Sequence, residues 1–250
     1  MAGKLKPTPL EAFDQSMEDA ELLVDLAEAF DNTRVRRMRR ELRERVGSLL
    51  KLPRREWDQL DCVESADVFV VLKPGGRITR ADFANRAPLL RQAIVAGCAA
   101  FETYLGDRAI AEARKRIAGR SELPARMQAI PMTIGAWDAV QSYRYPRRGI
   151  TERVIGPWLR EHVSTSPSKV GETLSLLGVD GPLHKIDGAR ARDKGRTEAD
   201  LQRITERRNK IAHEGDRRGY TRRSIDVEAV REELRILREI VAAIEKVLAR

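Results

Sequence analysis

The side chains best suited to chemistry lie in one short stretch, Glu206 to Asp216, which contains Arg208, Asn209 and His213 within about two turns of expected helix. A histidine can remove a proton from a ribose 2′-hydroxyl or donate one to a leaving oxygen. An arginine can bind a phosphate while negative charge grows on the phosphorus, and an amide can orient either group. This set suffices for metal-independent cleavage of RNA by its own 2′-hydroxyl, which DNA lacks.

The spacing of these residues limits what one chain can do. Asn209 and His213 are four residues apart, so on a helix they lie on one face, about 40° apart. Arg208 and His213 are five apart, about 140° around the helix. The two act together only if the helix is locally irregular or if a second molecule completes the site. Because one histidine supplies either the acid or the base, we expect a homodimer that brings two copies of Arg208 and His213 into one cleft.

The charge of the chain is compatible with a polyanionic partner. Forty-seven Lys and Arg against 38 Asp and Glu give a net charge of +9. Residues 185–223 hold thirteen basic and seven acidic residues, which is +6 of that excess. A basic field of this kind favours RNA as a partner, although a surface of mixed charge explains it as well. Arg207 and Lys210 flank the candidate pair and are predicted to contact RNA.

A second candidate RNA contact is the segment Ser142 to Arg148, where tyrosines alternate with arginines. Such alternation can stack bases and contact phosphates in single-stranded RNA, and it can equally pack a loop against helices. The residues assigned to RNA here are Tyr143, Arg144, Arg147 and Arg148. Glu102, within an apolar helical run, is predicted to be a surface or boundary residue, as is Tyr104. Glu102 can also support a site built from another helix.

The elements that must position these residues are predicted to be helices. Hydrophobic residues are mostly aliphatic, aromatics make up 5% and charged residues 34%, a mixture that favours an all-α fold. Helices are expected from Pro9 through Phe30, over 32–50, from about residue 82 or 88 to 117, over 151–163 and 166–177, from Thr197 to near Gly215, and after Ser224 or Asp226. Residues 178–196 are predicted to be a mobile or ligand-ordered connector, and the run over 68–72 a short strand or an extended segment. His162 and His184 are predicted to lie at the surface.

Local signals mark the ends and faces of these helices. Thr8 is expected to cap the first helix, Pro167 to take the first position of its helix, and Thr197 with Asp200 to form a start like a capping box. Four small residues, 97–100, are expected to let a neighbouring helix approach closely. The residues predicted to face inward on that helix are Leu89, Ile94, Ala99 and Leu105. The last helix has an apolar stripe from Val227 to Leu248 that suits a bundle core or a coiled-coil seam.

Several classes of protein and site are disfavoured. The chain has no run of eighteen apolar residues, so no membrane span is expected, and its first residues lack the apolar core of a secretory signal. Cys62 and Cys98 indicate neither a disulfide framework nor a metal cage, and His162 and His184 have no ligands at metal spacing. We therefore expect a cytoplasmic protein without metal or cofactor.

The stretch Arg207-Arg208-Asn209-Lys210-Ile211-Ala212-His213-Glu214-Gly215-Asp216 resembles the R-x4–6-H signature of the HEPN superfamily, and the RiboL-PSP-HEPN family in particular. The run from Leu90 to Leu105 is similar to that family's other core helix, and the resemblance covers roughly residues 83–250. It implies a HEPN-like helical bundle with added N-terminal helices. It also implies a dimeric, metal-independent ribonuclease of toxin or phage-defence systems, with Arg208 and His213 as the catalytic pair and Asn209 in support.

The resemblance divides the chain into an N-terminal helical extension with a short extended segment, residues 1–80, and a HEPN-like domain, residues 81–250. Some HEPN toxins carry a tyrosine two residues after the histidine that a partner enzyme modifies. Gly215 occupies that position here, which argues against this route, although an antitoxin or defence-system partner is still implied. Two alternatives stay open: a non-catalytic HEPN-like module that binds RNA or protein, and a structural helical partner in a larger complex.

Overall fold

The computed structural model describes residues 6–31, 36–37, 40–49, 51–55, 57, 62–63, 85–119 and 122–249. Within these ranges the chain is helical apart from two short strand pairs, so the predicted all-α class is confirmed. Strands β1 (Arg36–Arg37) and β2 (Cys62–Val63) pair antiparallel, as do β3 (Arg217–Arg218) and β4 (Thr221–Arg222). Residues form two compact units, one of Met1–Ala20, Ile94–Arg223 and Glu232–Arg250, the other of Glu21–Ala93 and Ser224–Arg231.

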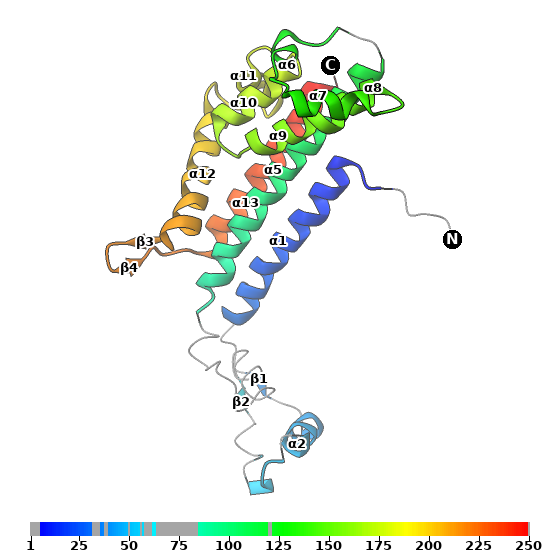
Figure 1. The fold of residues 1–250 in the computed structure, drawn as a ribbon. Helices are drawn as coiled ribbons and strands as arrows, with labels where there is room; N and C mark the ends of the chain where they lie inside the picture. Colours follow the sequence, from blue (N-terminus) through cyan, green and yellow to red (C-terminus); the bar gives the residue numbers. More distant parts are fainter. Residues whose placement is uncertain are drawn as a thin grey trace. The chain divides into compact units, whose positions relative to one another are not determined.

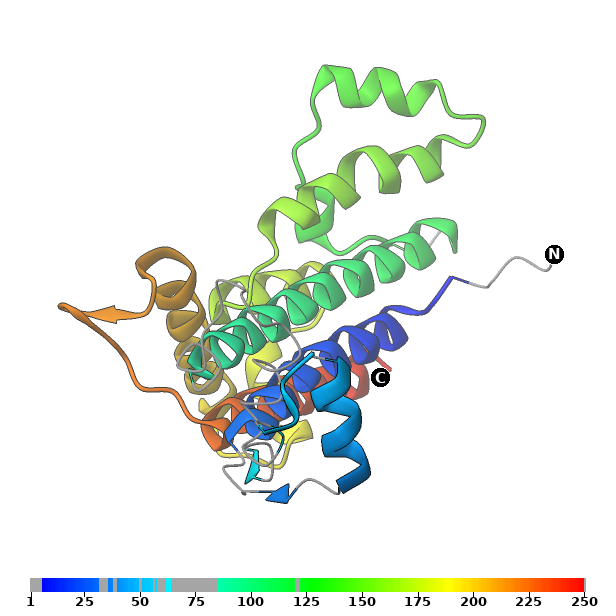
Figure 2. The same ribbon diagram turned by 90° about the horizontal axis from the view of Figure 1, so that it is seen from below.

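The first unit is organised around four helices whose residues within that unit lie side by side (Figures 1 and 2). They are α1 (Pro9–Asp31), α5 (Ala87–Ala118), α12 (Arg196–Glu214) and α13 (Val227–Leu248). Helix α1 begins with the predicted cap, because the hydroxyl of Thr8 accepts from the N–H of Glu11 and the Glu11 carboxylate accepts from the N–H of Thr8. Phe13 of α1 packs against the Tyr104 ring of α5 at 5.5 Å between centroids.

Helices α5 and α13 form the centre of the apolar core. The predicted stripe on α13 is buried from Val227 to Ile244, and only its last member, Leu248, is half-exposed. The small residues expected to let a helix approach α5 do so at Gly97, where an added Cβ would lie 2.4 Å from Cδ2 of Leu234. A side chain at this position would therefore force α5 and α13 apart.

Two expectations about α5 were wrong in detail. Ile94 and Leu105 are buried as predicted, but Ala99 is exposed, and the inward face also carries Leu90, Ala93, Cys98 and Phe101. Tyr104 is fully buried rather than a boundary residue. Its hydroxyl donates to Oε1 of Glu245 on α13 at 2.7 Å, which satisfies the polar end of the ring inside the core.

Between α5 and the next long helix the chain makes short helices that the proline and glycine pattern concealed. They are α6 (Ala125–Gln128), α7 (Ile134–Gln141), α8 (Pro146–Ile150), the π-helical turn η2 (Thr151–Ile155) and α9 (Gly156–His162). The helix predicted over 151–163 thus starts at Pro146 and widens where the N–H of Gly156 donates to the carbonyl of Thr151. Pro157, which has no N–H, follows directly.

The predicted helix over 166–177 is α10 (Pro167–Leu176), with proline at its first position as expected. The connector predicted over 178–196 was wrong, because it contains helix α11 (Pro182–Ala189). The buried Asp187 explains the order of this segment. Its carboxylate accepts 2.7 Å hydrogen bonds from the N–H groups of Gly195 and Thr197. Asp187 rather than a capping box at Thr197 therefore holds the start of α12.

In the second unit, α2 (Arg40–Leu49) is shorter than the helix predicted over 32–50, because Arg36 and Arg37 belong to the β1–β2 pair. Trp57 lies against Gly47 and donates its indole N–H to the carbonyl of Leu52. Arg231 pairs with Asp25 at 2.8 Å and Glu28 at 2.6 Å. The extended run predicted over 68–72 and the domain boundary near residue 80 fall outside the described residues.

Candidate active site

Arg208 is held on the side of α12 that faces α5. Its Nη2 donates to Oε2 of Glu102 at 3.4 Å and its Nη1 donates to Oδ1 of Asn209 at 3.1 Å, while 29% of its side chain stays exposed. Glu102 therefore does reach the candidate site from another helix, as the sequence allowed. Two acceptors fix the guanidinium, and the exposed remainder is available to a phosphate.

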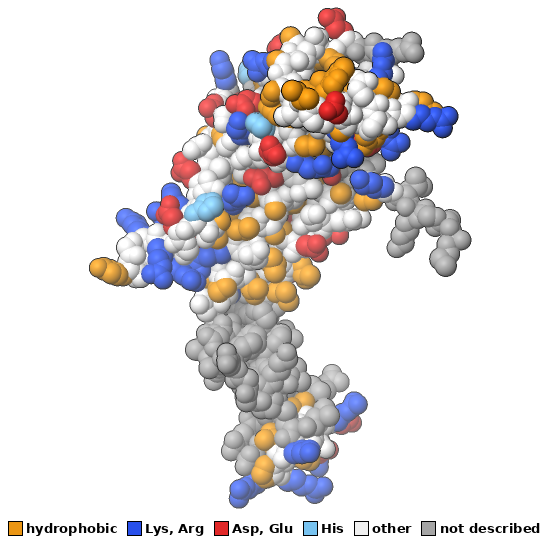
Figure 3. Space-filling view, viewed as in Figure 1, with side chains coloured by type: hydrophobic (Ala, Val, Ile, Leu, Met, Phe, Trp, Pro, Cys, Tyr) orange, Lys and Arg blue, Asp and Glu red, His pale blue; other side chains and the backbone are white. Residues whose placement is uncertain are grey.

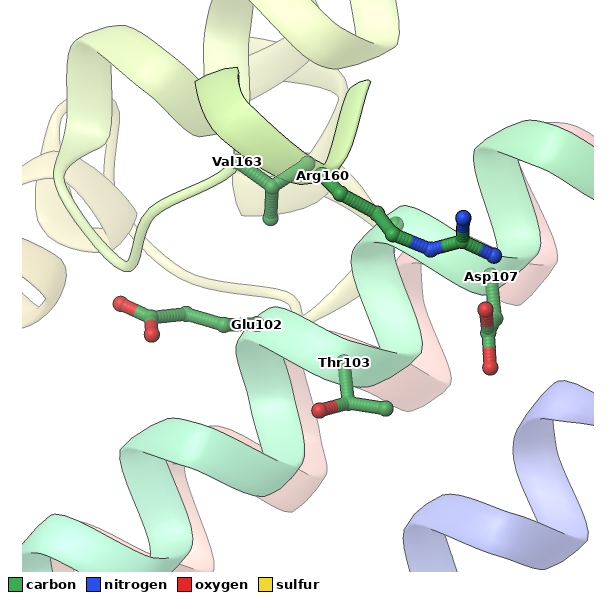
Figure 4. Close-up of a pocket in the computed structure, with 6 residues that line it drawn as sticks. Glu102, Thr103, Asp107, Arg160 and Val163 are labelled. Atoms are coloured by element: carbon green, nitrogen blue, oxygen red, sulfur yellow. The ribbon is translucent and has the colours of Figure 1, made fainter. Parts of the chain in front are cut away.

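Glu102 also ties this site to the chain that follows α9. Its Oε1 accepts from the N–H of Thr165 at 3.1 Å and from the Thr165 hydroxyl at 3.3 Å. Figure 4 shows the pocket of about 350 Å³ beside it, in which Glu102 and Arg160 line opposite parts and Arg160 extends toward Asp107. The Glu102 carboxylate is thus shared between Arg208 and the wall of this pocket.

His213 lies in the last turn of α12, exposed to solvent, and makes no hydrogen bond within the described part of the chain. Asn209 is exposed as well. Helix α12 is regular from Arg196 to Glu214, so the local irregularity that would bring Arg208 and His213 onto one face is absent from it. Arg208 faces α5 and His213 faces solvent. Of the two ways to unite them, only completion by a second molecule is compatible with this helix.

Arg207 is committed to the protein rather than open to a ligand. Its Nη1 lies 3.0 Å from Oδ1 of Asp216, whose side chain is 0% exposed. Asp216 has a positive φ of 58°, directly after Gly215 at 61°, and its N–H donates to the carbonyl of Lys210. These two left-handed residues end α12 and redirect the chain into β3–β4. Lys210 is half-buried and lies 3.9 Å from Glu206.

The strand pair β3–β4 was missed by sequence analysis. It presents Arg217, Arg218, Tyr220 and Arg222, all exposed, immediately after the candidate site. Figure 3 shows basic side chains gathered over this part of the surface. A signal was present in the sequence, because the segment Arg217 to Arg223 places Tyr220 between two pairs of arginines, and Ser142 to Arg148 also combines tyrosines with arginines.

The predicted RNA-contact segment at Tyr143 lies around α7 and α8, at the other end of the first unit from β3–β4 (Figure 1). Most of its polar groups are satisfied internally. Nε of Arg148 pairs with Glu152 at 2.9 Å, and the Tyr143 hydroxyl also donates to Glu152, while Arg147 approaches the carbonyl of Ile117 at 3.5 Å. The structure therefore does not bring this segment together with Arg208 and His213.

Other potentially reactive groups are buried or scattered. Burial, aided by the charge of Glu102, raises the pKa of the free thiol of Cys98 to about 12 and makes it a poor nucleophile. His184 is exposed as predicted, whereas His162 is half-buried and stacks on Trp158 at 3.9 Å between centroids. Among the residues that the structure describes, no cluster of three His, Cys, Asp or Glu side chains is placed to hold a metal ion.

No helix within the described ranges is long and apolar enough to cross a membrane. Comparisons of the chain with protein-family models, with curated proteins and with solved structures found no match. The HEPN resemblance consequently stays a prediction that rests on the residues from Leu90 to Leu105 and from Arg207 to Asp216.

Proposed function

We propose that this chain is a metal-independent endoribonuclease that works as a homodimer. The proposal rests on one observation, the different surroundings of Arg208 and His213, which lie about one and a half turns apart on α12. Arg208 is fixed by Glu102 and Asn209 with part of its guanidinium exposed, and His213 stands exposed without a partner within the described residues. An oriented cation and an open imidazole are the two groups that RNA cleavage by internal transfer needs.

In this mechanism one His213 removes the proton of a ribose 2′-hydroxyl, whose oxygen attacks the adjacent phosphorus. Arg208 stabilises the extra negative charge as the bond to phosphorus forms. The bond to the 5′-oxygen then breaks, and the His213 of a second copy supplies the proton to that oxygen. The products are a 2′,3′-cyclic phosphate and a 5′-hydroxyl, and the two histidines exchange roles before the next turnover.

The biological role follows only from the resemblance. A nuclease of this kind acts as a toxin or phage-defence effector, and an antitoxin or another defence protein is the matching partner. Gly215, which ends α12 with a φ of 61°, has no side chain that a partner could modify. We therefore propose that regulation takes another route.

A non-catalytic HEPN-like module that binds RNA or protein is the second candidate, and one observation favours it. Glu102 connects Arg208 to Thr165 through three hydrogen bonds, a network that holds α5, α12 and the segment after α9 together. Arg208 can therefore serve the fold alone. In that case the protein binds its ligand and yields no cyclic phosphate.

Cleavage of a labelled single-stranded RNA in EDTA separates the two candidates. We expect His213→Ala and Arg208→Ala to lower the cleavage rate by at least about 10²-fold, because each removes a group that acts in the transition state. The products should carry 2′,3′-cyclic phosphate ends, and the all-deoxy oligonucleotide should stay intact. Specific activity should fall when the protein is diluted until the dimer dissociates.

Matched controls are available on the same unit. His184→Ala and Arg126→Ala remove an exposed histidine on α11 and an exposed arginine on α6, and both should cleave like the parent. Circular dichroism and thermal unfolding establish that the site variants are folded. Undiminished cleavage by folded His213→Ala protein would refute the nuclease proposal.

A further inference from the structure

The strand pair β3–β4 exposes arginines that form no ion pair with the rest of the described chain. Arg217, Arg218 and Arg222 are exposed, and none has a carboxylate within ion-pair distance among the described residues. Tyr220, in the two-residue loop between the strands, is 103% exposed. Most other arginines of the first unit near the site, such as Arg203 and Arg207, do have acidic partners.

The register of the strands makes this arrangement unfavourable for the protein alone. Arg217 is directly opposite Arg222, and Arg218 is opposite Thr221. Like charges at opposite positions of an antiparallel pair are destabilising, and an isolated two-stranded hairpin is marginally stable in water. A polyanion that lies across the pair would remove this repulsion. The hairpin is therefore better suited to a bound anionic chain than to free solvent.

The base of the hairpin is nevertheless firmly held. The N–H of Asp216 donates to the carbonyl of Lys210, and the carbonyl of Asp216 accepts from the N–H of Arg223, both at 2.8 Å. Asp216 itself is buried beside Arg207. These bonds fix where the hairpin leaves α12, only three residues after His213. A chain bound to the hairpin would thus pass beside the imidazole.

The loop at the tip presents the tyrosine without steric strain. Gly219 has a positive φ of 64° at the first loop position, as in the tight turns that join twisted antiparallel strands. Tyr220 follows it with no side chain packed on either face. An exposed aromatic ring between arginines can stack on a base of any type, because every base has a π-face.

From these features we infer that the β3–β4 hairpin is an arm that binds single-stranded RNA, with Tyr220 stacked on a base and Arg217, Arg218 and Arg222 on the phosphates. The inference deepens the proposed function, on which it rests, by naming the part of the substrate that is held outside the cleavage site. A duplex is a poorer ligand, because its bases are already stacked on one another.

Binding is measured by fluorescence anisotropy with a labelled 12-nucleotide oligouridine, in the full-length chain carrying His213→Ala so that no cleavage takes place. Tyr220→Ala should weaken binding by roughly 5- to 100-fold, the range for loss of one base stack, and Tyr220→Phe should bind like the parent. The triple variant Arg217→Ser, Arg218→Ser and Arg222→Ser should lower the slope of log affinity against log salt by about 2, since each single-strand phosphate contact contributes about 0.7.

The matched control removes the same charge elsewhere. A triple variant with Arg114→Ser, Lys115→Ser and Arg126→Ser, three exposed cations of α5 and α6 that have no assigned contact with RNA, should change neither the affinity nor the salt slope by a comparable amount. Equal losses of RNA affinity in the two triple variants would mean that net charge alone causes the effect, and this would overturn the inference. A hairpin triple variant that binds RNA like the parent would also overturn it. Light scattering is run on every variant. A fall from dimer to monomer in the hairpin variants would assign the arm to contact between copies and also overturn it.

The cleavage and binding measurements distinguish a wrong inference about the hairpin from a wrong proposal of nuclease activity. If the chain with His213 intact cleaves RNA while hairpin variants bind it normally, the proposed function stands and the arm is wrong. If that chain does not cleave but Tyr220→Ala loses binding, the arm stands and the nuclease proposal fails. A parent that binds no oligouridine at any salt concentration overturns the inference.

Discussion

Two segments of this protein combine arginines with tyrosine and differ in their structural role. Ser142 to Arg148 has three arginines and two tyrosines, and Arg217 to Arg223 has four arginines around one tyrosine. In Ser142 to Arg148, Arg148 pairs with Glu152 and Arg147 approaches the carbonyl of Ile117, whereas Arg144 lies over the Tyr145 ring. On β3–β4 the exposed arginines find no acidic partner among the described residues, and Tyr220 touches nothing.

The difference lies in the surroundings rather than in the segments themselves. The segment near α8 is helical, so Glu152 falls four residues after Arg148 and can pair with it. The side chains of the hairpin are exposed, and Asp216 at its base is already buried beside Arg207. An arginine-tyrosine pattern therefore indicates a nucleic-acid contact only where the fold leaves the cations unpaired.

The largest expected effect concerns the anchor of the hairpin. Arg207→Ala removes the guanidinium that pairs with the buried Asp216 carboxylate and should lower the free energy of unfolding by about 3 kcal/mol, the lower end for a broken buried pair because Arg207 is 18% exposed. Arg148→Ala, which breaks the exposed pair near α8, should leave the unfolding midpoint unchanged. Urea unfolding followed by circular dichroism measures both.

Asp216→Asn provides the matched variant for this test. Asparagine tolerates the positive φ at this position, so the substitution removes the charge and keeps the backbone. A double-mutant cycle with Arg207→Ala should show that the two losses are not additive. Additive losses would mean that Arg207 and Asp216 stabilise the hairpin base independently.

The second prediction concerns the helix that carries the hairpin. Helix α8 has no side-chain cap, whereas Asp187 holds the start of α12. Burial acts to raise the pKa of Asp187, but hydrogen bonds from Thr197 and Gly195, with the charge of Arg190, outweigh it and lower the pKa. A lowered folded-state pKa adds stability above the ordinary aspartate value, near 4, and that stability is lost as the pH falls through the folded pKa.

Asp187→Asn should therefore cost about 1–2 kcal/mol at pH 7, and the difference from the parent should shrink below about pH 4. Urea unfolding at pH values from 3 to 7 gives the comparison. A difference that is constant across this range would show that the carboxylate charge does not hold the start of α12.

The smallest expected effect concerns Glu152, because without its charge Arg148 would be unpaired like the arginines of the hairpin. A hydrogen bond from Arg148 is the main cause of a lowered pKa at Glu152, so this carboxylate is charged at neutral pH and neutralises the arginine. Glu152→Gln should free Arg148 and raise the salt slope of RNA binding by about 0.7 in the His213→Ala background. An unchanged slope would mean that internal pairing is not what separates the two segments.

Much of the helical scaffold followed from the sequence, because local patterns determined it. The Thr8–Glu11 cap, the start of α10 at Pro167, the end of α12 at Gly215 and the stripe on α13 each depend on residues within a turn or two of one another. The helix α11 was missed because its stability depends on Asp187, whose carboxylate bonds to N–H groups eight and ten residues away.

For the candidate site, the sequence by itself determined which side chains are available, namely Arg208, Asn209 and His213 on one helix. It also determined that the arginine and the histidine point about 140° apart around that helix. Only the tertiary structure decided which of these groups are committed. Glu102 and Asn209 hold Arg208, Asp216 takes Arg207, and His213 and the β3–β4 arginines stay open within the described chain. The physical reason is that Glu102 lies on another helix and Asp216 lies beyond the end of α12, so folding rather than helical spacing sets the distance from each acid to its arginine.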